Sequence, residues 1–546
     1  MKNTMQNRPV EWTFISSKSY PDPFNDVELG VAVTEPDGKK RFVHGFWAGG
    51  QTWKVRYASP LTGTCHYKSV CSDPMNADLH DRTGSVEVVA YQGDNPLYLH
   101  GPLRKSEDGR YVEHSDGKPF FWLADTWWMG LSHRMKWPED IHYLAQDRMK
   151  KGFNVIQLVA GLNPDMSPFD DRGANEAGFP WNREYTQINP AYFDMADRRI
   201  EYLVESGLMP CIVGCWGFYL EVAGKEAMMK HWNYLSARYG AYPIFWCLAG
   251  EAVMPFYTHP SFGHVEKHNQ YAVGSKKGWT EITKHLKERD PFHRPLTIHP
   301  TDKGHEMVED AAALLDLDML QTGHGSVYCM ENTISMVRDA VGREPRLPVL
   351  NSEVCYEGLF GSNHHDTQRV LFWSCLLSGA CGHSYGANGI WQVNRKGKPY
   401  GSRPGIEGGV GFGSFGNTPW DEASQLLGST HMGLGRKLFE RYRWWAMEPH
   451  PEWVDIHADV KQYMAPYAAG IPGEFRVFFL PVLGSPIWEG ITVRHIEPDV
   501  DYRAYYYDPM TGESLEMQEV AADAEGNWQA GRMPVAQDWV LVLERI

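Results

Sequence analysis

The sequence predicts an α/β fold: a (β/α)8 TIM barrel flanked by N-terminal and C-terminal antiparallel β-sandwich domains. Between about Tyr111 and His431, eight apolar runs alternate with amphipathic helical segments, a pattern typical of βα units around a parallel sheet. Shorter runs of alternating apolar and polar residues occupy both ends of the chain. At 546 residues the chain exceeds what one hydrophobic core usually supports. We therefore expect three domains, at 1–105, 106–448 and 449–546.

The two terminal domains are expected to be sandwiches of short strands. In the N-terminal domain, apolar and polar residues alternate at 10–16, 26–38, 40–50, 52–60, 85–94 and 97–103. Asp-Gly, Gly-Gly and Asp-Asn pairs between these runs are turn signals. In the C-terminal domain, similar runs lie at 460–468, 474–482, 490–498, 501–509 and 538–544.

The middle domain repeats one unit, a strand followed by a helix. Its strand runs lie at 121–128, 153–161, 209–217, 243–251, 295–300, 317–325, 347–357 and 381–391. Helix-like segments between and after them include 138–152, 193–207, 225–240, 367–380 and 419–441. Several of these segments end at Gly, the usual residue after a helix C-cap. Eight units in about 300 residues match a barrel better than an open doubly wound sheet.

Polar and aromatic residues gather where the strand runs end. In a barrel the strand ends meet at one face, and this face carries the chemistry. The residues there are Asp125, Trp127, Trp128, Gln157, Trp216, Glu251, His299, Gln321, His324, Glu353, Tyr385 and Trp391. Each run starts apolar and finishes polar, which packing alone does not explain, so we expect a pocket at this face.

Glu251 and Glu353 are the predicted catalytic pair. They end the fourth and seventh runs, and a barrel brings those two strand ends to opposite sides of one cavity. Glycoside cleavage needs one carboxylic acid to protonate the leaving oxygen and one carboxylate to attack the anomeric carbon, about 5 to 5.5 Å apart if configuration is retained. We assign Glu251 as general acid/base and Glu353 as nucleophile. A salt bridge at the barrel rim is the structural alternative for either glutamate alone.

The remaining strand-end residues are predicted to bind substrate. Asp125 is expected to bind sugar hydroxyls, with a structural network as the alternative. Four tryptophans offer faces for sugar stacking, or pack as core aromatics: Trp127, Trp128, Trp216 and Trp391. The other predicted ligands of the sugar are polar, and some of them could instead tune the nucleophile: Gln157, His299, Gln321, His324 and Tyr385.

Composition and motif spacing bear on cofactors and partners. The histidines lack HExxH or a similar ligand spacing, so we expect neither a metal nor another cofactor. The formal net charge is −16 and no long basic run occurs, which disfavours nucleic acid as a partner. The expected partner is a carbohydrate substrate, and a homo-oligomer is compatible with the sequence.

Cysteine usage and the terminus bear on location. The nine cysteines are an odd number and several lie in apolar runs, which favours reduced, buried thiols. Cys65 and Cys71 are the one plausible disulfide pair. The N-terminus has no apolar signal core and no run of about 18 apolar residues occurs. We expect a cytoplasmic protein without a membrane segment, although a removed signal peptide would leave the same sequence.

Four segments, in this order, resemble the apiosidase-like glycoside hydrolases: DGKPFFWLADTWW, YPIFWCLAGE, LPVLNSEVCYEG and GHSYGANGIW. The resemblance covers nearly the whole chain and implies a barrel related to the large retaining clan with acids on strands four and seven. It also implies an N-terminal sandwich and a C-terminal sandwich similar to a module labelled collagen-binding, for which we expect a structural role.

By this resemblance Glu251 corresponds to the acid/base and Glu353 to the nucleophile. The family often has Asp where this chain has Glu251, which is longer by one methylene, so specificity for apiose is not implied. Fold-level analogy does not choose the sugar.

The predicted function is that of a retaining glycoside hydrolase, exo-acting on a terminal sugar of a plant or microbial polysaccharide or glycoside. Exo action is expected because bulky aromatics crowd the strand ends and because long loops at 161–190 and 252–278 could wall off a groove. An inverting glycosidase is one alternative and requires carboxyls about 6.5 to 9.5 Å apart. A non-catalytic carbohydrate-binding barrel is another.

Overall fold

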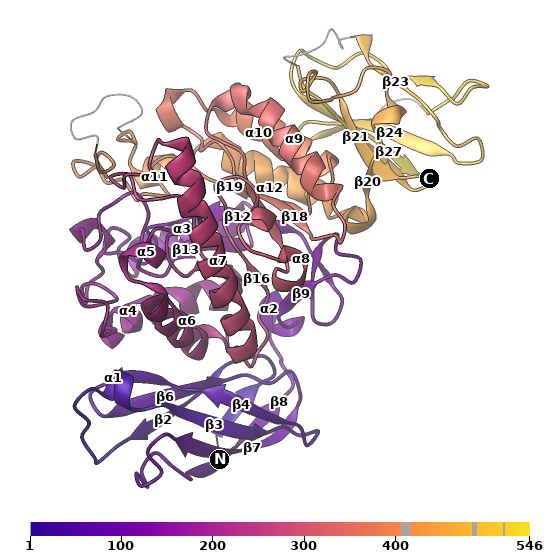
Figure 1. The fold of residues 1–546 in the computed structure, drawn as a ribbon. Helices are drawn as coiled ribbons and strands as arrows, with labels where there is room; N and C mark the ends of the chain where they lie inside the picture. The colour runs from indigo at the N-terminus through magenta and orange to yellow at the C-terminus, as the bar shows by residue number, and fades with distance from the viewer. Residues whose placement is uncertain (1, 406–414, 483–488, 517–518) are drawn as a thin grey trace.

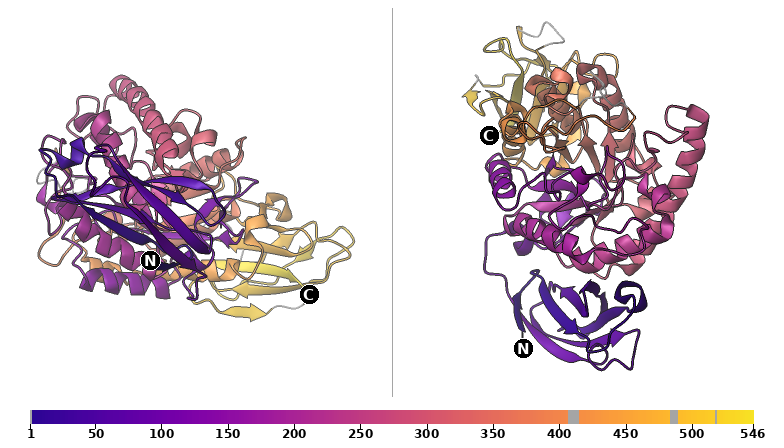
Figure 2. Two further views of the ribbon diagram at one scale, coloured as in Figure 1. Left: turned by 90° about the horizontal axis from the view of Figure 1, so that it is seen from below. Right: turned by 90° about the vertical axis from the view of Figure 1, so that its left-hand side faces the viewer.

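The computed structural model describes residues 2–405, 415–482, 489–516 and 519–546. The barrel lies in the middle of the molecule, with the N-terminal sheets at one end and the C-terminal sheets at the other (Figure 1). The right-hand view of Figure 2 shows the same order, whereas the left-hand view, from below, has the N-terminal sheets in front of the barrel and the C-terminal part projecting to one side. Of the helices in these ranges, none combines the length and apolar character that a membrane crossing requires.

The middle of the chain forms the predicted barrel, which the structure confirms. One sheet of eight parallel strands has the order β16-β15-β14-β13-β12-β19-β18-β17. Each predicted run contains one of these strands, which are β12 (Trp122–Thr126), β13 (Val155–Val159), β14 (Met209–Val213), β15 (Phe245–Cys247), β16 (Leu296–Thr297), β17 (Asp318–Gln321), β18 (Val349–Glu353) and β19 (Gly382–Tyr385).

The barrel is nearly closed, because β16 meets the start of β17 through hydrogen bonds of Leu296 and Thr297 rather than through a regular ladder. Asp316 N donates to Leu296 O at 2.8 Å, and Thr297 Oγ1 donates to Leu317 O at 2.7 Å. These bonds hold the first and last strands of the sheet order side by side. The carboxyl ends of all eight strands therefore open on one face.

Helices cover the outside of the strands (Figure 1). The longer ones are α3 (Glu139–Lys150), α4 (Pro190–Glu205), α6 (Lys225–Tyr239), α7 (Val265–Arg289), α9 (Met330–Val341), α10 (His365–Leu377) and α12 (Leu427–Phe439). β16 is followed by a 3-10 turn, η2 (Gly304–Glu306), and the short helix α8 (Ala311–Leu314). The segment 419–441, expected to be one helix, contains α11 (Trp420–Ala423) and α12, because Leu426 is extended with φ −60° and ψ 139°.

The N-terminal part is a sandwich of two sheets. One has the order β1-β8-β7-β3-β4 and the other β2-β6-β5. The strands are β1 (Lys2–Met5), β2 (Val10–Ile15), β3 (Leu29–Thr34), β4 (Lys40–His44), β5 (Phe46–Gly49), β6 (Thr52–Tyr57), β7 (Gly63–Cys71) and β8 (Thr83–Val89). Buried Val31, Val33, Trp53 and Val86 pack in its core.

Two details of this sandwich differ from the expectation. The pairing is antiparallel except that β1 runs parallel to β8. The run at 97–103 is not one strand, because it begins in a helical turn, α2 (Pro96–Leu99), and ends in β9 (Leu103–Lys105). Asn95 Oδ1 accepts from Leu97 N at 3.0 Å, and Pro96 suits the first position of a helix. β9 pairs with β10 (Val112–His114), which pairs with β11 (Pro119–Phe120).

The C-terminal part is built on a six-stranded antiparallel sheet with the order β20-β21-β22-β27-β24-β25. Its strands are β20 (Glu448–Pro449), β21 (Tyr467–Ile471), β22 (Phe475–Leu480), β24 (Tyr502–Tyr507), β25 (Ser514–Glu516) and β27 (Trp539–Arg545). A small sheet of β23 (Thr492–Val493) and β26 (Trp528–Gln529) packs on one side of it. Its other side rests on the barrel, where Phe479 stacks on Trp373 of α10 at 5.9 Å.

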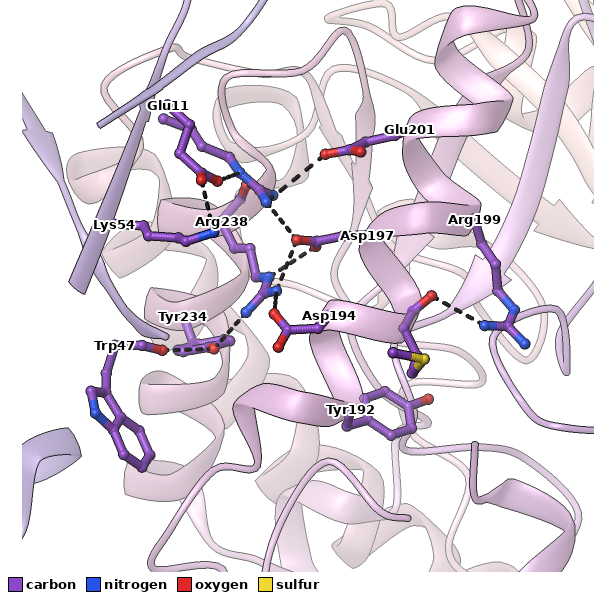
Figure 3. A network of polar contacts seen from close by, with 12 residues as sticks. Glu11, Trp47, Lys54, Tyr192, Asp194, Asp197, Arg199, Glu201, Tyr234 and Arg238 are labelled. Atoms are coloured by element: carbon purple, nitrogen blue, oxygen red, sulfur yellow. Dashed lines mark hydrogen bonds and ion pairs between the residues drawn. The ribbon is translucent and has the colours of Figure 1, made fainter. Parts of the chain in front are cut away.

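Buried charges join the N-terminal sandwich to the barrel (Figure 3). Arg56 of β6 donates from Nε to Glu11 at 3.0 Å and forms an ion pair with Asp197 of α4. Arg238 of α6 donates from Nε to Asp197 at 2.9 Å and also pairs with Asp194. Burial alone would raise the pKa of Asp197, but Arg56 and Arg238 outweigh it and lower the pKa to about 2. Every charge in this network has a partner of opposite sign.

All nine cysteines are free thiols. Cys65 and Cys71, the pair that the sequence suggested, both lie on β7. Cys71 lies six positions after Cys65 along an extended strand, which places their Cα atoms about 20 Å apart, well beyond the reach of a disulfide.

Candidate active site

The two glutamates lie at the same end of the barrel. Glu353 is the last residue of β18, whereas β15 ends at Cys247, so Glu251 lies in the loop just beyond its strand. A bridge between Trp216 and Gly250 continues the strand pairing up to Glu251. Glu251 has φ +43°, a left-handed conformation that residues other than glycine rarely adopt. Strain of this kind is often held at functional sites by the surrounding structure.

One amide connects the two carboxyl groups. Gln321, the last residue of β17, donates from Nε2 to Glu251 Oε1 at 3.1 Å and to Glu353 Oε1 at 3.4 Å. Because a single nitrogen reaches both oxygens, the two carboxyls face each other across a short gap.

Two histidines hold Glu353. His324 Nε2 lies 3.0 Å from Glu353 Oε1, and His299 Nε2 lies 3.1 Å from Glu353 Oε2. His299 Nδ1 in turn lies 3.1 Å from Ser352 Oγ, which orients the ring. Burial raises the pKa of Glu353, but the two histidines outweigh it and lower the pKa to about 2. Glu353 is therefore ionised at neutral pH.

Glu251 has neutral hydrogen-bond donors instead. Trp216 Nε1 donates to Glu251 Oε2 at 2.9 Å, and Gln321 reaches the other oxygen. Burial and the negative charge of Glu353 raise the pKa of Glu251, and the hydrogen bonds from Gln321 and Trp216 only partly oppose this. Its carboxyl therefore keeps a proton to higher pH than an exposed glutamate does.

A cavity of about 300 Å³ lies above this pair. It is lined by Trp128, Asp165, Trp216, Glu251, Met254, Tyr257, Phe262, Gln321, His324, Glu353, Tyr356, Leu359, Phe360, Trp391, Arg403 and Phe415. A mainly aromatic wall with a few convergent polar groups is the usual form of a small-molecule site. Aromatic faces with carboxyl, amide and imidazole groups suit a sugar, which has apolar ring faces and polar edges.

The structure brings seven of the twelve predicted site residues to this cavity. They are Trp128, Trp216, Glu251, Gln321, His324, Glu353 and Trp391. His299 is fully buried and does not line the cavity, although it touches Glu353.

The other four predicted residues lie outside the lining. Asp125 is fully buried and accepts from Arg148 Nε at 2.6 Å and from Trp127 Nε1 at 2.7 Å. Gln157 donates to Ser352 O at 3.3 Å, which ties β13 to β18. Tyr385 donates from its hydroxyl to Glu357. These contacts are those of a structural network beneath the cavity, the alternative considered for Asp125.

Sequence reasoning missed several lining residues. Tyr356 follows Glu353 by three residues, and Trp128 Nε1 donates to its hydroxyl at 2.9 Å. Asp165 lies in the expected wall loop 161–190, Tyr257 lies within 252–264, and Arg403 lies in the loop after β19. The second expected wall loop, 252–278, is shorter than predicted, because α7 begins at Val265. Tyr356 lies near the end of the predicted seventh strand run, 347–357, so the rule that polar strand-end residues face the pocket could have identified it. The loop residues follow no periodic pattern that would have marked them.

The geometry supplies the two groups that acid-assisted displacement at an anomeric carbon requires. Two imidazoles lower the pKa of one carboxyl, and burial beside that charge raises the pKa of the other. Pairs of carboxyls whose environments separate their pKa values take the base and acid roles in such reactions.

Two family models match parts of this chain, one over the barrel and one over the N-terminal sandwich. Residues 106–446 match the family described as apiosidase-like, catalytic domain, and residues 3–72 match a family described as a domain of unknown function (DUF5060). A comparison with curated proteins gives no match.

Several solved structures share the fold. A glycoside hydrolase family 5 protein from Bacteroides vulgatus ATCC 8482 has a TM-score of 0.65 and 20% identity, covering 83% of this chain and 95% of its own. A structure described as a glycoside hydrolase has a TM-score of 0.64 and 21% identity, covering 83% and 98%. A second Bacteroides vulgatus protein, described as a candidate glycoside hydrolase, has a TM-score of 0.70 and 16% identity over all of both chains. At these identities the likeness concerns the fold.

The family match spans more than half of the chain, over the whole barrel that holds the facing carboxyls. The protein is therefore a glycoside hydrolase and belongs to the apiosidase-like family.

Proposed function

We propose that this glycoside hydrolase retains anomeric configuration, with Glu353 as nucleophile and Glu251 as general acid/base. The observation that carries this proposal is the opposite effect of the protein on two facing carboxyls. The histidines lower the pKa of Glu353, so this carboxyl is ionised at neutral pH, whereas burial and the charge of Glu353 raise the pKa of Glu251. A nucleophile must be ionised while the proton donor still holds its proton, and a difference in pKa of this sign favours that pairing.

In the first step, Glu353 attacks the anomeric carbon while Glu251 donates its proton to the glycosidic oxygen. The glycosidic bond breaks, the leaving group departs with the proton, and an ester joins the sugar to Glu353. In the second step, Glu251, now ionised, takes a proton from water, that water attacks the anomeric carbon, and the ester bond to Glu353 breaks to release its carboxylate. The sugar leaves with its original configuration, and both carboxyls return to their starting states.

The short gap between the carboxyls supports retention over inversion. Oxygens at 3.1 Å and 3.4 Å from one nitrogen must lie closer together than the sum of those distances. An inverting enzyme needs roughly 6.5 to 9.5 Å between its carboxyls to admit a water.

We also propose exo action on a terminal sugar, supported by contacts that join the loops around the cavity. The Tyr257 hydroxyl donates to Asp165, which links the loop after β15 to the loop after β13. Tyr400, in the loop after β19, donates from its hydroxyl to Pro164 O at 3.1 Å. Arg172 donates from Nη1 to Tyr400 O at 3.0 Å. Loops tied in this way close a groove into a pocket that fits one chain end.

The cavity lining and the family match support a proposal for the substrate class. We infer a terminal sugar of a plant or microbial polysaccharide or glycoside, held by Trp128, Trp216, Gln321, His324 and Trp391. His299 has a different role in this proposal, because it positions Glu353 without facing the cavity.

The first test is the stereochemistry of the product. Aryl glycosides of both anomers, pyranosides and furanosides, are offered to the wild-type protein, and NMR follows the anomer that appears first. Retention requires the first product to have the configuration of the substrate. An inverted first product would contradict the nucleophile assignment and leave the glycosidase intact.

A covalent trap then identifies the nucleophile. A 2-deoxy-2-fluoro glycosyl fluoride of the cleaved sugar should add one glycosyl mass to the protein, on the peptide that contains Glu353. Glu353→Gln should take up no label. Glu331→Gln, a change of the same chemistry on the exposed surface of α9, should label as wild type does.

A further inference from the structure

Asp165 is a third carboxyl group in the catalytic cavity, beside Glu251 and Glu353. It lies in the loop after β13 and has φ +54°, a left-handed conformation that only some non-glycine residues tolerate. The preceding residue is held in place, because Pro164 O accepts from the Tyr400 hydroxyl at 3.1 Å. The loop thus presents the Asp165 side chain to the cavity in one fixed orientation.

Two residues from other loops meet Asp165. The Tyr257 hydroxyl donates to Asp165 Oδ1, and the Arg403 guanidinium lies 5.1 Å from the centre of the Tyr257 ring. Arg403 Nε is buried and has no acceptor among the residues that the structure describes. This corner of the cavity therefore offers a carboxyl, a phenol hydroxyl and a guanidinium within one small space.

The corner lies on the acid/base side, near the mouth of the cavity. Tyr257 follows Glu251 by six residues in the same loop, whereas Glu353 belongs to the opposite strand end. Glu353, Trp128, Tyr356 and Trp391 are all buried, while Asp165, Tyr257 and Glu251 remain partly exposed. A sugar bonded to Glu353 would occupy the deep part, and the group protonated by Glu251 would depart past this corner.

We propose that Asp165, Tyr257 and Arg403 form the binding site for the leaving group, and that they select a hydroxylated leaving group, another sugar, over an apolar one. The inference rests on the proposed function, because it uses the acid/base role of Glu251 to decide which side the leaving group takes. In this proposal Asp165 determines the specificity of the enzyme for its leaving group.

The chemistry of the corner suits sugar hydroxyls. A carboxyl oxygen accepts hydrogen bonds, the phenol can donate or accept, and the guanidinium only donates. Burial and the charges of Glu251 and Glu353 raise the pKa of Asp165 to about 7, although Tyr257 and Arg403 oppose the shift. At lower pH the protonated carboxyl also supplies a donor. An apolar leaving group would cover these polar atoms without replacing their bonds to water, which is unfavourable.

The test compares two leaving groups on the same sugar. The variants are Asp165→Ala, Asp165→Asn and Tyr257→Phe, and the control is Asp171→Asn, whose side chain is 88% exposed on the same loop. The substrates are a 4-nitrophenyl glycoside that wild type cleaves and a disaccharide with the same terminal sugar and anomer. Loss of a buried polar contact predicts a fall in kcat/KM of about 10- to 100-fold for Asp165→Ala on the disaccharide. On the aryl glycoside the same variant should lose less than about threefold, since that leaving group makes no such bonds.

Activity on the aryl glycoside shows in each variant that the fold and the two glutamates are intact. Hydrolysis of the glycosyl-enzyme, measured as kcat when that step limits the rate, should be unchanged, because the leaving group has already departed. Equal losses on both substrates, or no loss on the disaccharide, would overturn the leaving-group site while the glycosidase stands. If wild type cleaved no member of the panel of aryl glycosides from which this substrate is chosen, the proposed function itself would be overturned.

Discussion

The interface network and the catalytic cavity both bury carboxyl groups, but they treat them differently. At the interface, Asp197 lies between Arg56 and Arg238, and these cations lower its pKa to about 2. In the cavity, Glu251 accepts hydrogen bonds from an indole and an amide, and burial beside Glu353 raises its pKa. A buried charge neutralised by fixed cations joins elements together. A buried carboxyl without such a cation remains available to exchange a proton.

Glu353 combines features of both environments. Like Asp197, Glu353 contacts positively polarised side chains that lower its pKa. Its contacts are the imidazoles of His299 and His324, and Glu353 also lines the cavity. Asp125, paired with fully buried Arg148, belongs with the interface type although its strand position resembles that of the catalytic residues.

The largest effect should come from the cavity. Glu353→Gln should lower kcat on an aryl glycoside by about 10⁴-fold or more, because in the proposed retaining mechanism it removes the nucleophile. Initial rates with a sensitive fluorogenic leaving group give the measurement, with Glu331→Gln as the control. Rates near wild type in Glu353→Gln would show that another group attacks the sugar.

A substitution in the interface network should lower the free energy of unfolding rather than the rate of catalysis. Asp197→Asn leaves Arg56 and Arg238 buried with one carboxylate fewer, which should cost about 3 to 5 kcal/mol of unfolding free energy. Chemical denaturation at pH 7 measures this, and KM of the surviving enzyme should stay unchanged. Glu251→Gln should cost far less stability, because Glu251 has no paired cation to strand. If Glu251→Gln destabilised as much as Asp197→Asn, the contrast between the two regions would fail.

Lowering the pH should remove the contribution that Asp197 makes to the free energy of unfolding. The folded pKa of Asp197 is below its ordinary value of 3.8, so its contribution to stability is present above about pH 4 and is lost as pH falls toward 2. Asp197→Asn should therefore flatten the acid part of the curve of unfolding free energy against pH. A curve as steep as that of wild type would indicate that other carboxylates dominate acid unfolding.

The pH profile of kcat/KM should reflect the two cavity carboxyls, which titrate as an interacting pair. Activity should fall in acid as Glu353 gains a proton and in alkali as Glu251 loses one. His324→Asn removes a partner that lowers the pKa of Glu353, so the acid limb should move up by about one pH unit. An acid limb that stays in place would mean that His324 does not control the charge of Glu353.

The smallest effect should come from the indole donor. Trp216→Phe keeps an aromatic ring but removes the hydrogen bond to Glu251 that lowers its pKa. The alkaline limb should therefore move up, by less than about one pH unit, since one neutral hydrogen bond contributes about 0.5 to 1.5 kcal/mol. A downward shift would contradict the reading of Glu251 as the group behind that limb.

The sequence by itself determined the barrel, the two flanking sandwiches and the positions of Glu251 and Glu353. The physical reason is that strand and helix periods, and the change from apolar to polar at a strand end, are local properties of the chain. The same local rule failed at residues 97–103, where the cap from Asn95 favoured a helical turn, and at Leu426, where one extended residue divided a predicted helix.

Only the tertiary structure decided which strand-end residues face the cavity and what surrounds them. Asp125 follows the same pattern as Glu353, yet Arg148, 23 residues away, lies against it and neutralises it. Asp165 and Tyr257 meet across 92 residues of chain, from loops whose sequences carry no period. The pKa of a carboxyl depends on burial and on charges from distant elements, so the pKa values of Glu251 and Glu353 move apart only when the barrel closes around them.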